Sequence, residues 1–245
     1  MCGFEGAQNL VSTDSAWHKA SVSRPPDDAE NAYWNRFYSQ AHQELEAPSS
    51  FALHVADDLG LVKSGSRLFE LGCGNGRDAL FFASRGVRVT GCDRSQVAVD
   101  KLRARPDLER FEHEPQFVVA DFLELEHAYR GPAPTVVYSR FTLHAVPSKV
   151  QAAALGWARR KLAPGGKLLI EVRSVNGSLY GKGSQVDRDA FLHDGHYRRF
   201  VRMDELTSEL TTLGFSIDSA IESSGVAVYR DDDPVVIRLV ATQAS

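Results

Sequence analysis

Cysteine is scarce in this chain, and none of its cysteines stands at a metal-ligand spacing. The 245 residues contain three cysteines, Cys2, Cys73 and Cys92. An odd and sparse set argues against a disulfide framework, and no pair has the short spacing of a structural zinc site. We therefore expect no metal, and we expect Cys73 and Cys92 to be small buried residues at strand ends.

Long apolar segments and an excess of positive charge are also missing. No segment approaches the ~20 apolar residues of a membrane-spanning helix, and the N-terminus shows no apolar signal-peptide core. Lys and Arg number 28 against 32 Asp and Glu, a formal net charge of −4, which gives no broad attraction to nucleic acid or to an anionic membrane. We expect a cytoplasmic protein with neither nucleic acid nor membrane as a partner, and no sequence feature sets its oligomeric state.

The residues that are present have the composition of a folded chain. Hydrophobic residues make up 43% and charged residues 24%, as in ordinary globular proteins. Residues 1–27 mix Gly, Ser, Asp and Pro, and they predict a flexible leader. A helical pattern follows, with a second helix capped by Ser49 or Ser50. We expect N-terminal helices over residues 28–60 and one α/β domain over residues 61–245.

From residue 61 onward, apolar strand-like runs alternate with amphipathic helix-like segments. The expected strands cover residues 67–71, 87–92, 116–119, 135–139 and 167–172. The expected helices between them cover residues 77–84, 96–105, 123–129 and 148–162. Nearly continuous apolar strands separated by helices are typical of a doubly wound, mostly parallel sheet that is covered on both faces.

The C-terminal part departs from this alternation. Residues 174–200 are rich in glycine, charge and aromatic side chains, and we expect them to form a long substrate loop. A helix at 203–213 and strands at 215–222 and 235–241 follow, and the tight polar turn Asp231–Pro234 joins the two strands. Because such a pair resembles a hairpin, the predicted fold is a mostly parallel seven-stranded sheet whose last strand is antiparallel.

A glycine-rich turn stands between the first strand and the first helix of the alternation. It reads Glu70-Leu71-Gly72-Cys73-Gly74-Asn75-Gly76-Arg77. Glycine lets the backbone approach a ligand closely, and a helix N-terminus offers unpaired N–H groups to an anionic group. The turn therefore predicts a cofactor site at the carboxyl ends of the strands.

Two cofactors compete for such a turn. A dinucleotide loop has its third glycine at the position of Arg77, whereas the third glycine here is Gly76. Glu70 lies two positions before the first glycine, and Asp93 ends the second predicted strand, where a carboxylate can accept hydrogen bonds from both ribose hydroxyls. This spacing disfavours NAD, although an NAD-dependent oxidoreductase stays open as an alternative.

These motifs resemble the motif series of class I S-adenosylmethionine (SAM)-dependent methyltransferases over roughly residues 50–240. The series is Glu70-x-Gly72-x-Gly74-x-Gly76, then Asp93, then Ala120-Asp121-Phe122. The resemblance implies that the three glycines line the methionine part of SAM, that Asp93 holds the ribose, and that Asp121 and Phe122 contact the adenine. It implies that Glu70 reaches the methionine amino group and that the product is S-adenosylhomocysteine (SAH). Arg94 and Arg140 complete the candidate cofactor-binding residues.

In this superfamily the residues after the fourth strand border the transferring methyl group. Here that segment contains Arg140 and His144, which are the candidate catalytic residues. A neutral imidazole can take a proton from a hydroxyl or an amine, because its ordinary pKa is about 6.5. His144 can equally be a structural residue that packs in the core.

A narrower resemblance concerns bacterial methyltransferases of surface-polysaccharide and natural-product pathways. It is carried by Tyr33-Trp34-x-x-Phe37-Tyr38, Pro48-Ser49-x-Phe51-Ala52, Ser139-Arg140-Phe141-x-Leu143-His144 and His196-Tyr197-Arg198-Arg199-Phe200. It implies a small, polar acceptor that is anionic or sugar-like, and an N-terminal helix that acts as a lid. The candidate acceptor-binding residues are aromatic or basic: Tyr33, Trp34, Tyr38, His144, Arg173, Tyr180, Arg198 and Arg199.

Other interpretations stay open beside this one. A non-catalytic cofactor-binding regulator would have an eroded glycine turn or no acid at Asp93, and neither is the case. A nucleic-acid methyltransferase is disfavoured by the net charge and by the absence of an Asn/Asp-Pro-Pro-aromatic segment after the fourth strand. The candidate arginines can also form ordinary salt bridges with Glu171, Asp187 or Asp189.

Overall fold

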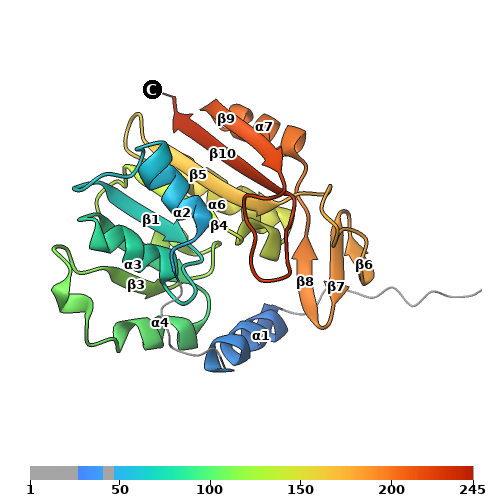
Figure 1. Cartoon of the computed structure of the whole chain (residues 1–245), viewed down its shortest axis with the longest axis horizontal. Helices are drawn as coiled ribbons and strands as arrows, with labels where there is room; N and C mark the ends of the chain where they lie inside the picture. The colour runs from blue at the N-terminus through green and yellow to red at the C-terminus, as the bar shows by residue number, and fades with distance from the viewer. Residues whose placement is uncertain (1–26, 41–46, 245) are drawn as a thin grey trace, which may run out of the picture.

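A seven-stranded sheet runs through the centre of the computed structural model, which describes residues 27–40 and 47–244 (Figure 1). The strand order is β3-β2-β1-β4-β5-β10-β9. The bounds are β1 Arg67–Leu71, β2 Arg88–Asp93, β3 Gln116–Val119, β4 Val136–Arg140, β5 Lys167–Arg173, β9 Phe215–Ser223 and β10 Val236–Gln243. Strands β1 to β5 pair in parallel, and β10 is antiparallel to both β5 and β9. The predicted mostly parallel sheet with an antiparallel last strand is confirmed.

The apolar strands form because both faces of the sheet are buried. Side chains alternate along β1, so Phe69 and Leu71 join the core on one face while Leu68 joins the core on the other. Burial on both faces explains why the strand sequences are almost continuously apolar. Glu70 is the exception in β1, an acid on the same face as Leu68.

Helices cover each face, as expected for a doubly wound domain. The core that contains Leu68 includes side chains of α2 (Ser50–Leu53), α3 (Arg77–Ser84) and α4 (Gln96–Arg103). The opposite core includes side chains of α5 (Leu125–Ala128), α6 (Ser148–Lys161) and α7 (Met203–Thr212). Three short helical turns complete this part: η1 His54–Asp58, η2 Leu108–Arg110 and η3 Leu143–Ala145.

No helix in the described part of the chain is both long and apolar enough to cross a membrane.

Ser49 fixes the start of α2 and ties it to the sheet. Its hydroxyl accepts a hydrogen bond from the backbone N–H of Ala52 at 3.0 Å and donates one to Asp78 at 2.7 Å. The Ser49 N–H and the Tyr138 hydroxyl also donate to Asp78, each at 2.8 Å. Of the two predicted caps, the structure uses Ser49, and the buried Asp78 carboxylate accepts hydrogen bonds from Ser49 and Tyr138.

The prediction of a long loop over residues 174–200 is wrong. The segment contains a second, three-stranded antiparallel sheet made of β6 (Ser184–Asp187), β7 (Ala190–His193) and β8 (His196–Arg199). The turn between β7 and β8 has Asp194 and Gly195 at its centre, with φ of 52° and 72°. Two consecutive positive φ angles are the requirement of a type I′ hairpin turn, and Asp-Gly is a preferred pair for it. The Asp194-Gly195 pair indicates a hairpin already in the sequence, but the prediction of a loop rested on the overall composition of the segment.

The connection between β9 and β10 is also longer than the predicted turn Asp231–Pro234. It spans residues 224–235, and its tip is closed by hydrogen bonds between the backbones of Tyr229 and Asp232. In Figure 1 this connection hangs from the sheet beside β8, in the direction of α1. A tight turn was expected because an acidic run before a proline is typical of one. The acidic residues instead form part of the longer connection 224–235.

Helix α1 (Asp27–Gln40) lies apart from the sheet and spans from α4 to β8 (Figure 1). The Arg94 guanidinium donates to Glu30 at 3.1 Å, and the Ser95 hydroxyl donates to the side chain of Asn35 at 2.7 Å. At the other side, the ring of Tyr33 stacks on His196 with centroids 4.9 Å apart. The predicted leader, residues 1–27, lies outside the described residues except for Asp27, where α1 begins.

Ser49→Ala should lower the free energy of unfolding by about 1–2 kcal/mol, because it removes a helix cap and leaves Asp78 with fewer donors. Chemical denaturation measures this. Ser39→Ala is the matched control, since among the described residues the Ser39 hydroxyl bonds only to Asn35 of the preceding turn of its own helix, and it should change stability by less than about 0.5 kcal/mol. Equal stabilities of the two variants would contradict the anchoring role of Ser49.

Candidate active site

A cavity of about 960 Å³ opens at the carboxyl ends of the parallel strands. Residues after β1, β2, β3, β4 and β5 line it, as expected where the strands of an open α/β sheet end. From these strand ends the lining residues are Glu70, Gly72, Cys73, Gly74, Asp93, Arg94, Ala120, Asp121, Phe122, Arg140, Phe141, Thr142 and Arg173. Side chains of α1 and of the connection 224–235 also line it: Trp34, Phe37, Tyr38, Gln40, Tyr229, Arg230 and Asp232.

Two positions of the glycine turn after β1, Gly72 and Gly74, are packed too closely for a side chain. Gly72 and Gly74 have φ of 72° and 54°. A Cβ on Gly72 would lie 2.4 Å from the side chain of Thr142, and one on Gly74 would lie 2.4 Å from the Tyr38 hydroxyl. Both positions therefore require glycine. Gly76 has a different surrounding, since its Cβ would meet Leu102 of α4, and it is not among the described residues of the cavity lining.

Glu70 is a buried acid that faces the cavity with unused bonding capacity. It is 4% exposed, and its Oε2 has no hydrogen-bond partner among the residues that the structure describes. Burial, and next the charge of Asp78, hold the pKa of Glu70 well above its usual range, although Arg140 opposes them. A buried acceptor of this kind fits the ammonium group of the methionine part of SAM, so the residues present fit the expected cofactor.

Asp93 joins the glycine turn to the start of α4. Its Oδ2 accepts the N–H of Gly74 and its Oδ1 accepts the N–H of Ser95, both at 2.9 Å. Burial raises its pKa, while these two backbone donors lower it. Each carboxylate oxygen has a second lone pair, so Asp93 can hold the turn and still accept hydrogen bonds from a ligand in the cavity.

Asp121 and Phe122 follow β3 and line the same side of the cavity. Asp121 accepts the N–H of Leu123 at 2.9 Å, which closes the turn that leads toward α5. Arg94 stands 3.7 Å from Asp121 and 3.1 Å from Glu30. Arg94 therefore connects this side of the cavity to α1.

His144 lies in η3 beneath the cavity and is not among its described lining residues. It is 5% exposed, and the edge of its ring meets Phe141 with centroids 5.4 Å apart. Burial, and next the charge of Arg173, hold its pKa well below the ordinary value, so the imidazole is neutral at pH 7. Phe141 stands at the lining instead, with a φ of 54° that is unusual for an aromatic residue.

The structure separates the candidate arginines by what they bind. Arg140 lines the cavity, but it donates to Glu171 at 2.9 Å, and Arg238 donates to the same buried carboxylate at 2.7 Å. Arg199 is 9% exposed, and it donates to the carbonyls of Leu143 and Val146 and to the side chain of Gln151. We therefore remove Arg199 from the acceptor-binding set.

Tyr180 is likewise not among the described lining residues. Its hydroxyl donates to Asp189 at 2.6 Å, and its ring packs edge-on against Phe191 and Phe200. Arg202 donates to the same Asp189. Tyr180 thus belongs to the small core beneath the three-stranded sheet, and its prediction as an acceptor-binding residue is not supported by its place.

The aromatic residues of α1 divide in the same way. Trp34 and Tyr38 line the cavity, whereas Tyr33 stacks on His196. Burial, and next the charge of Asp93, hold the pKa of Tyr38 well above its usual value, so its hydroxyl stays a hydrogen-bond donor.

Several lining residues had no signal in the sequence. The positive φ of Phe141 and the side-chain contact of Thr142 with Gly72 depend on the fold. Tyr229, Arg230 and Asp232 were expected only in or near a surface turn. Within residues 27–40 and 47–244, no group of three or more His, Cys, Asp or Glu side chains could hold a metal ion.

The chain is similar to known methyltransferases. A family profile described as a methyltransferase domain matches residues 38–220. The chain is 27% identical over 199 residues to the 27-O-demethylrifamycin SV methyltransferase of Amycolatopsis mediterranei (strain S699), which covers 81% of this chain and 70% of that protein. It is 29% identical over 165 residues to the tRNA (carboxymethyluridine(34)-5-O)-methyltransferase ALKBH8 of Macaca fascicularis. That match covers 65% of this chain and spans about a quarter of the relative, 23% of its length.

A solved structure shows the same fold. It is the 1,6-didemethyltoxoflavin-N1-methyltransferase of Burkholderia thailandensis with bound 1,6-didemethyltoxoflavin and SAH. The TM-score is 0.65 at 18% identity, and the superposition covers 91% of this chain and 92% of that chain.

Glu70→Gln should stabilise the protein at neutral and alkaline pH, by about 1–3 kcal/mol, the order of the penalty for a buried polar group without a partner. Because the folded protein holds the Glu70 proton more tightly than the unfolded chain, wild type loses stability as pH rises above the ordinary glutamate value of about 4.3. Below that pH both states are protonated, so the two proteins should converge. Thermal unfolding between pH 4 and pH 8.5 measures the difference.

The matched control for this prediction is Glu114→Gln, which changes the same charge at an exposed position. It should follow the wild-type profile. A constant difference between wild type and Glu70→Gln over the whole pH range would show that Glu70 does not titrate as its burial requires.

Proposed function

The chain belongs to the SAM-dependent methyltransferases of class I fold, and on this premise we propose that it methylates a small polar molecule that is anionic or sugar-like. The accepting atom in this proposal is a hydroxyl, an amine or an acidic oxygen. The observation that carries it is the presence of Arg173 among the residues that line the cavity, together with the acids Glu70 and Asp93. Membership of this family sets aside the NAD-dependent oxidoreductase and the non-catalytic regulator.

The cofactor half of the cavity supports an assignment of roles. When bound, SAM supplies a methyl group on a sulfonium centre, which an acceptor attacks in line. We assign Glu70 to the methionine ammonium, Asp93 to the ribose hydroxyls, and Asp121 with Phe122 to the adenine. The close packing of Gly72 and Gly74 leaves the backbone of the turn free to line the methionine part.

Helix α1 is proposed as the lid of the site. Trp34, Phe37 and Tyr38 present their rings to the cavity, and the Glu30–Arg94 pair holds the helix beside the proposed adenine end. A cover of aromatic side chains excludes water, which strengthens the electrostatic interactions beneath it. The division into N-terminal helices 28–60 and a domain at 61–245 is part of this proposal.

The acceptor half of the cavity favours orientation over proton transfer. His144 is neutral but does not line the cavity, so we assign it to packing beneath Phe141 rather than to general-base catalysis. Holding acceptor and methyl group in line supplies an effective molarity on the order of 10⁵ M or more. Arg140 shares the buried Glu171 with Arg238, whereas Arg173 pairs with Asp232, whose side chain is 40% exposed, so we assign Arg173 to an anionic acceptor.

Two features favour a small acceptor over RNA. The cavity is lined from several sides by α1, the strand ends and the connection 224–235, and the chain carries a net charge of −4, which opposes binding to a polyanion. We propose no nucleic-acid partner, and the cytoplasmic location stays a prediction from the sequence.

Calorimetry with SAM and SAH tests the cofactor assignment. Asp93→Asn should weaken SAH binding by about 1–3 kcal/mol, roughly 5- to 150-fold, because the ribose hydroxyls lose a charged acceptor. Asp100→Asn is the control and should bind as wild type does, since Asp100 is an exposed residue of α4 whose side chain accepts a hydrogen bond from Gln96. No heat with either ligand on folded wild-type protein would reject the function.

A screen of polar metabolites and sugar derivatives with methyl-labelled SAM tests the acceptor. With the acceptor in hand, Arg173→Lys should lower kcat/KM by about tenfold or more, because a lysine cannot grip a carboxylate or phosphate through two parallel hydrogen bonds. Arg199→Lys should leave kcat/KM near wild type and lower the free energy of unfolding by about 1.5–3 kcal/mol instead. An acceptor without an anionic group, or normal kcat/KM in Arg173→Lys, would contradict the assignment.

A further inference from the structure

Arg173 extends from the end of β5 into the acceptor half of the cavity. Its side chain is 11% exposed and pairs with Asp232. Its guanidinium also lies over the ring of Phe141, 5.2 Å from the centroid, while Arg140 lies 4.4 Å from the same centroid. Contact with an aromatic face holds a guanidinium in place without using its hydrogen-bond donors. Arg173 is therefore fixed at the cavity with its donors directed to a carboxylate.

The surroundings of Arg173 hold more positive charge than Asp232 neutralises. Arg198, on β8, lies near enough that burial and the charge of Arg173 both lower its pKa, and Asp232 opposes them. The Nε of Arg198 is buried without a hydrogen-bond partner among the residues that the structure describes. Burial is the largest cause that lowers the pKa of His144, and the charges of Arg173 and Arg198 come next. One carboxylate thus stands against two nearby guanidinium groups.

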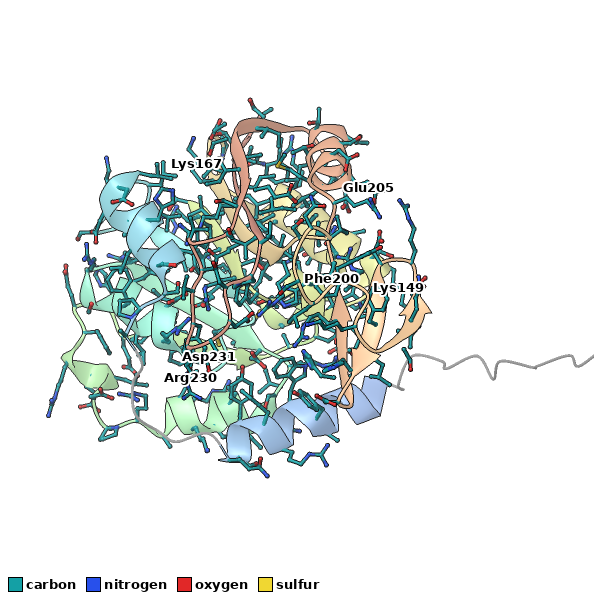
Figure 2. All side chains as sticks on the ribbon, turned by 45° about the vertical axis from the view of Figure 1, so that its right-hand side comes forward. Lys149, Lys167, Phe200, Glu205, Arg230 and Asp231 are labelled. Atoms are coloured by element: carbon teal, nitrogen blue, oxygen red, sulfur yellow. The ribbon has the colours of Figure 1, made fainter. Side chains whose placement is uncertain are left out.

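That carboxylate is carried by the tip of the connection between β9 and β10. The ends of the connection are anchored, since Ala227 is buried and the Val226 carbonyl accepts hydrogen bonds from Ser50 and Arg238. The side chains at the tip are more exposed, since Val228 is 59% exposed and Tyr229 is 42% exposed. Figure 2 shows Arg230 and Asp231 at the lower end of the connection, where it comes down toward α1.

A segment with anchored ends and exposed side chains at its tip can open locally while the rest of the domain stays folded. The Asp232 side chain is 40% exposed, so solvent reaches its pair with Arg173 and weakens the pair relative to one that is buried on both sides. An anionic ligand that enters the cavity can therefore compete for Arg173. A phosphate or a carboxylate also matches the donor geometry that Asp232 uses there.

We propose that Asp232 occupies the position beside Arg173 that the anionic group of the acceptor takes when the acceptor binds. A carboxylate or phosphate of the acceptor displaces Asp232 from Arg173, and the tip Tyr229–Asp232 moves aside. The proposal rests on the proposed methyl transfer, because it concerns the acceptor half of the same cavity. It assigns recognition to Arg173, and it makes Asp232 an internal competitor that weakens the binding of every anionic ligand. Arg198 is not among the described lining residues, and it adds only nearby positive charge. Acceptors without such a group would leave the tip in place.

Calorimetry with inorganic phosphate and with malonate tests this on full-length protein saturated with SAH, so that the cofactor half is filled. Asp232→Asn should bind both probes about three- to tenfold more tightly than wild type, because it removes a competing charge of modest strength. Asp231→Asn is the matched control: it removes the same charge one residue away, at an exposed position, and it should bind as wild type does. Arg173→Gln combined with Asp232→Asn should bind at least tenfold more weakly than Asp232→Asn alone.

The outcomes separate the two proposals. Equal probe affinities of wild type and Asp232→Asn, with SAH binding intact, would overturn the role of Asp232 and leave the methyltransferase assignment standing. A gain of the same size in Asp231→Asn would reduce the effect to net charge and overturn it too. If the double variant binds the probes as tightly as Asp232→Asn alone, Arg173 does not recognise the anionic group. Absence of SAH binding by wild type would overturn the proposed function and this inference with it.

Discussion

Asp93 accepts one backbone hydrogen bond from Gly74 and another from Ser95, and the geometry of the cavity follows from this pair. The first bond holds the glycine turn after β1 against the end of β2, and the second fixes the residue that caps α4. With the turn held there, Gly72 and Gly74 can pack against Thr142 and Tyr38. A carboxylate that is already oriented by two donors loses little freedom when a ligand binds, so the site is formed before the cofactor arrives.

Buried charge is distributed unevenly around this cavity, and the distribution separates stability from binding. The charges that belong to the fold are satisfied: Asp78 by Ser49 and Tyr138, and Glu171 by two arginines. Glu70 is different, because it is buried and one of its oxygens has no partner among the described residues. A group that is costly in the free protein and useful in the complex is a common sign of a binding site. Arg199 is held by buried carbonyls, whereas Arg173 pairs with Asp232, whose side chain is 40% exposed.

Two segments that lie far apart in the sequence form the cover of the site. Helix α1 supplies aromatic side chains, and the connection 224–235 supplies Tyr229, Arg230 and Asp232. The first is held by α4 and β8, and the second by its anchored ends. Because the two covers are independent of one another in the chain, the cofactor half and the acceptor half of the cavity can be closed by different elements.

The sequence by itself determined the sheet, the glycine turn and the acids at the strand ends. Strand ranges such as 67–71 and 116–119 agree with β1 and β3, because apolar periodicity and turn residues act over a few neighbours. The tertiary structure alone decided which polar side chains meet. Arg173 and Arg199 look alike in the sequence, but one reaches the cavity and the other binds the carbonyls of Leu143 and Val146. Burial of His144 and the approach of Asp232 to Arg173 depend in the same way on contacts between distant segments, which no local pattern encodes.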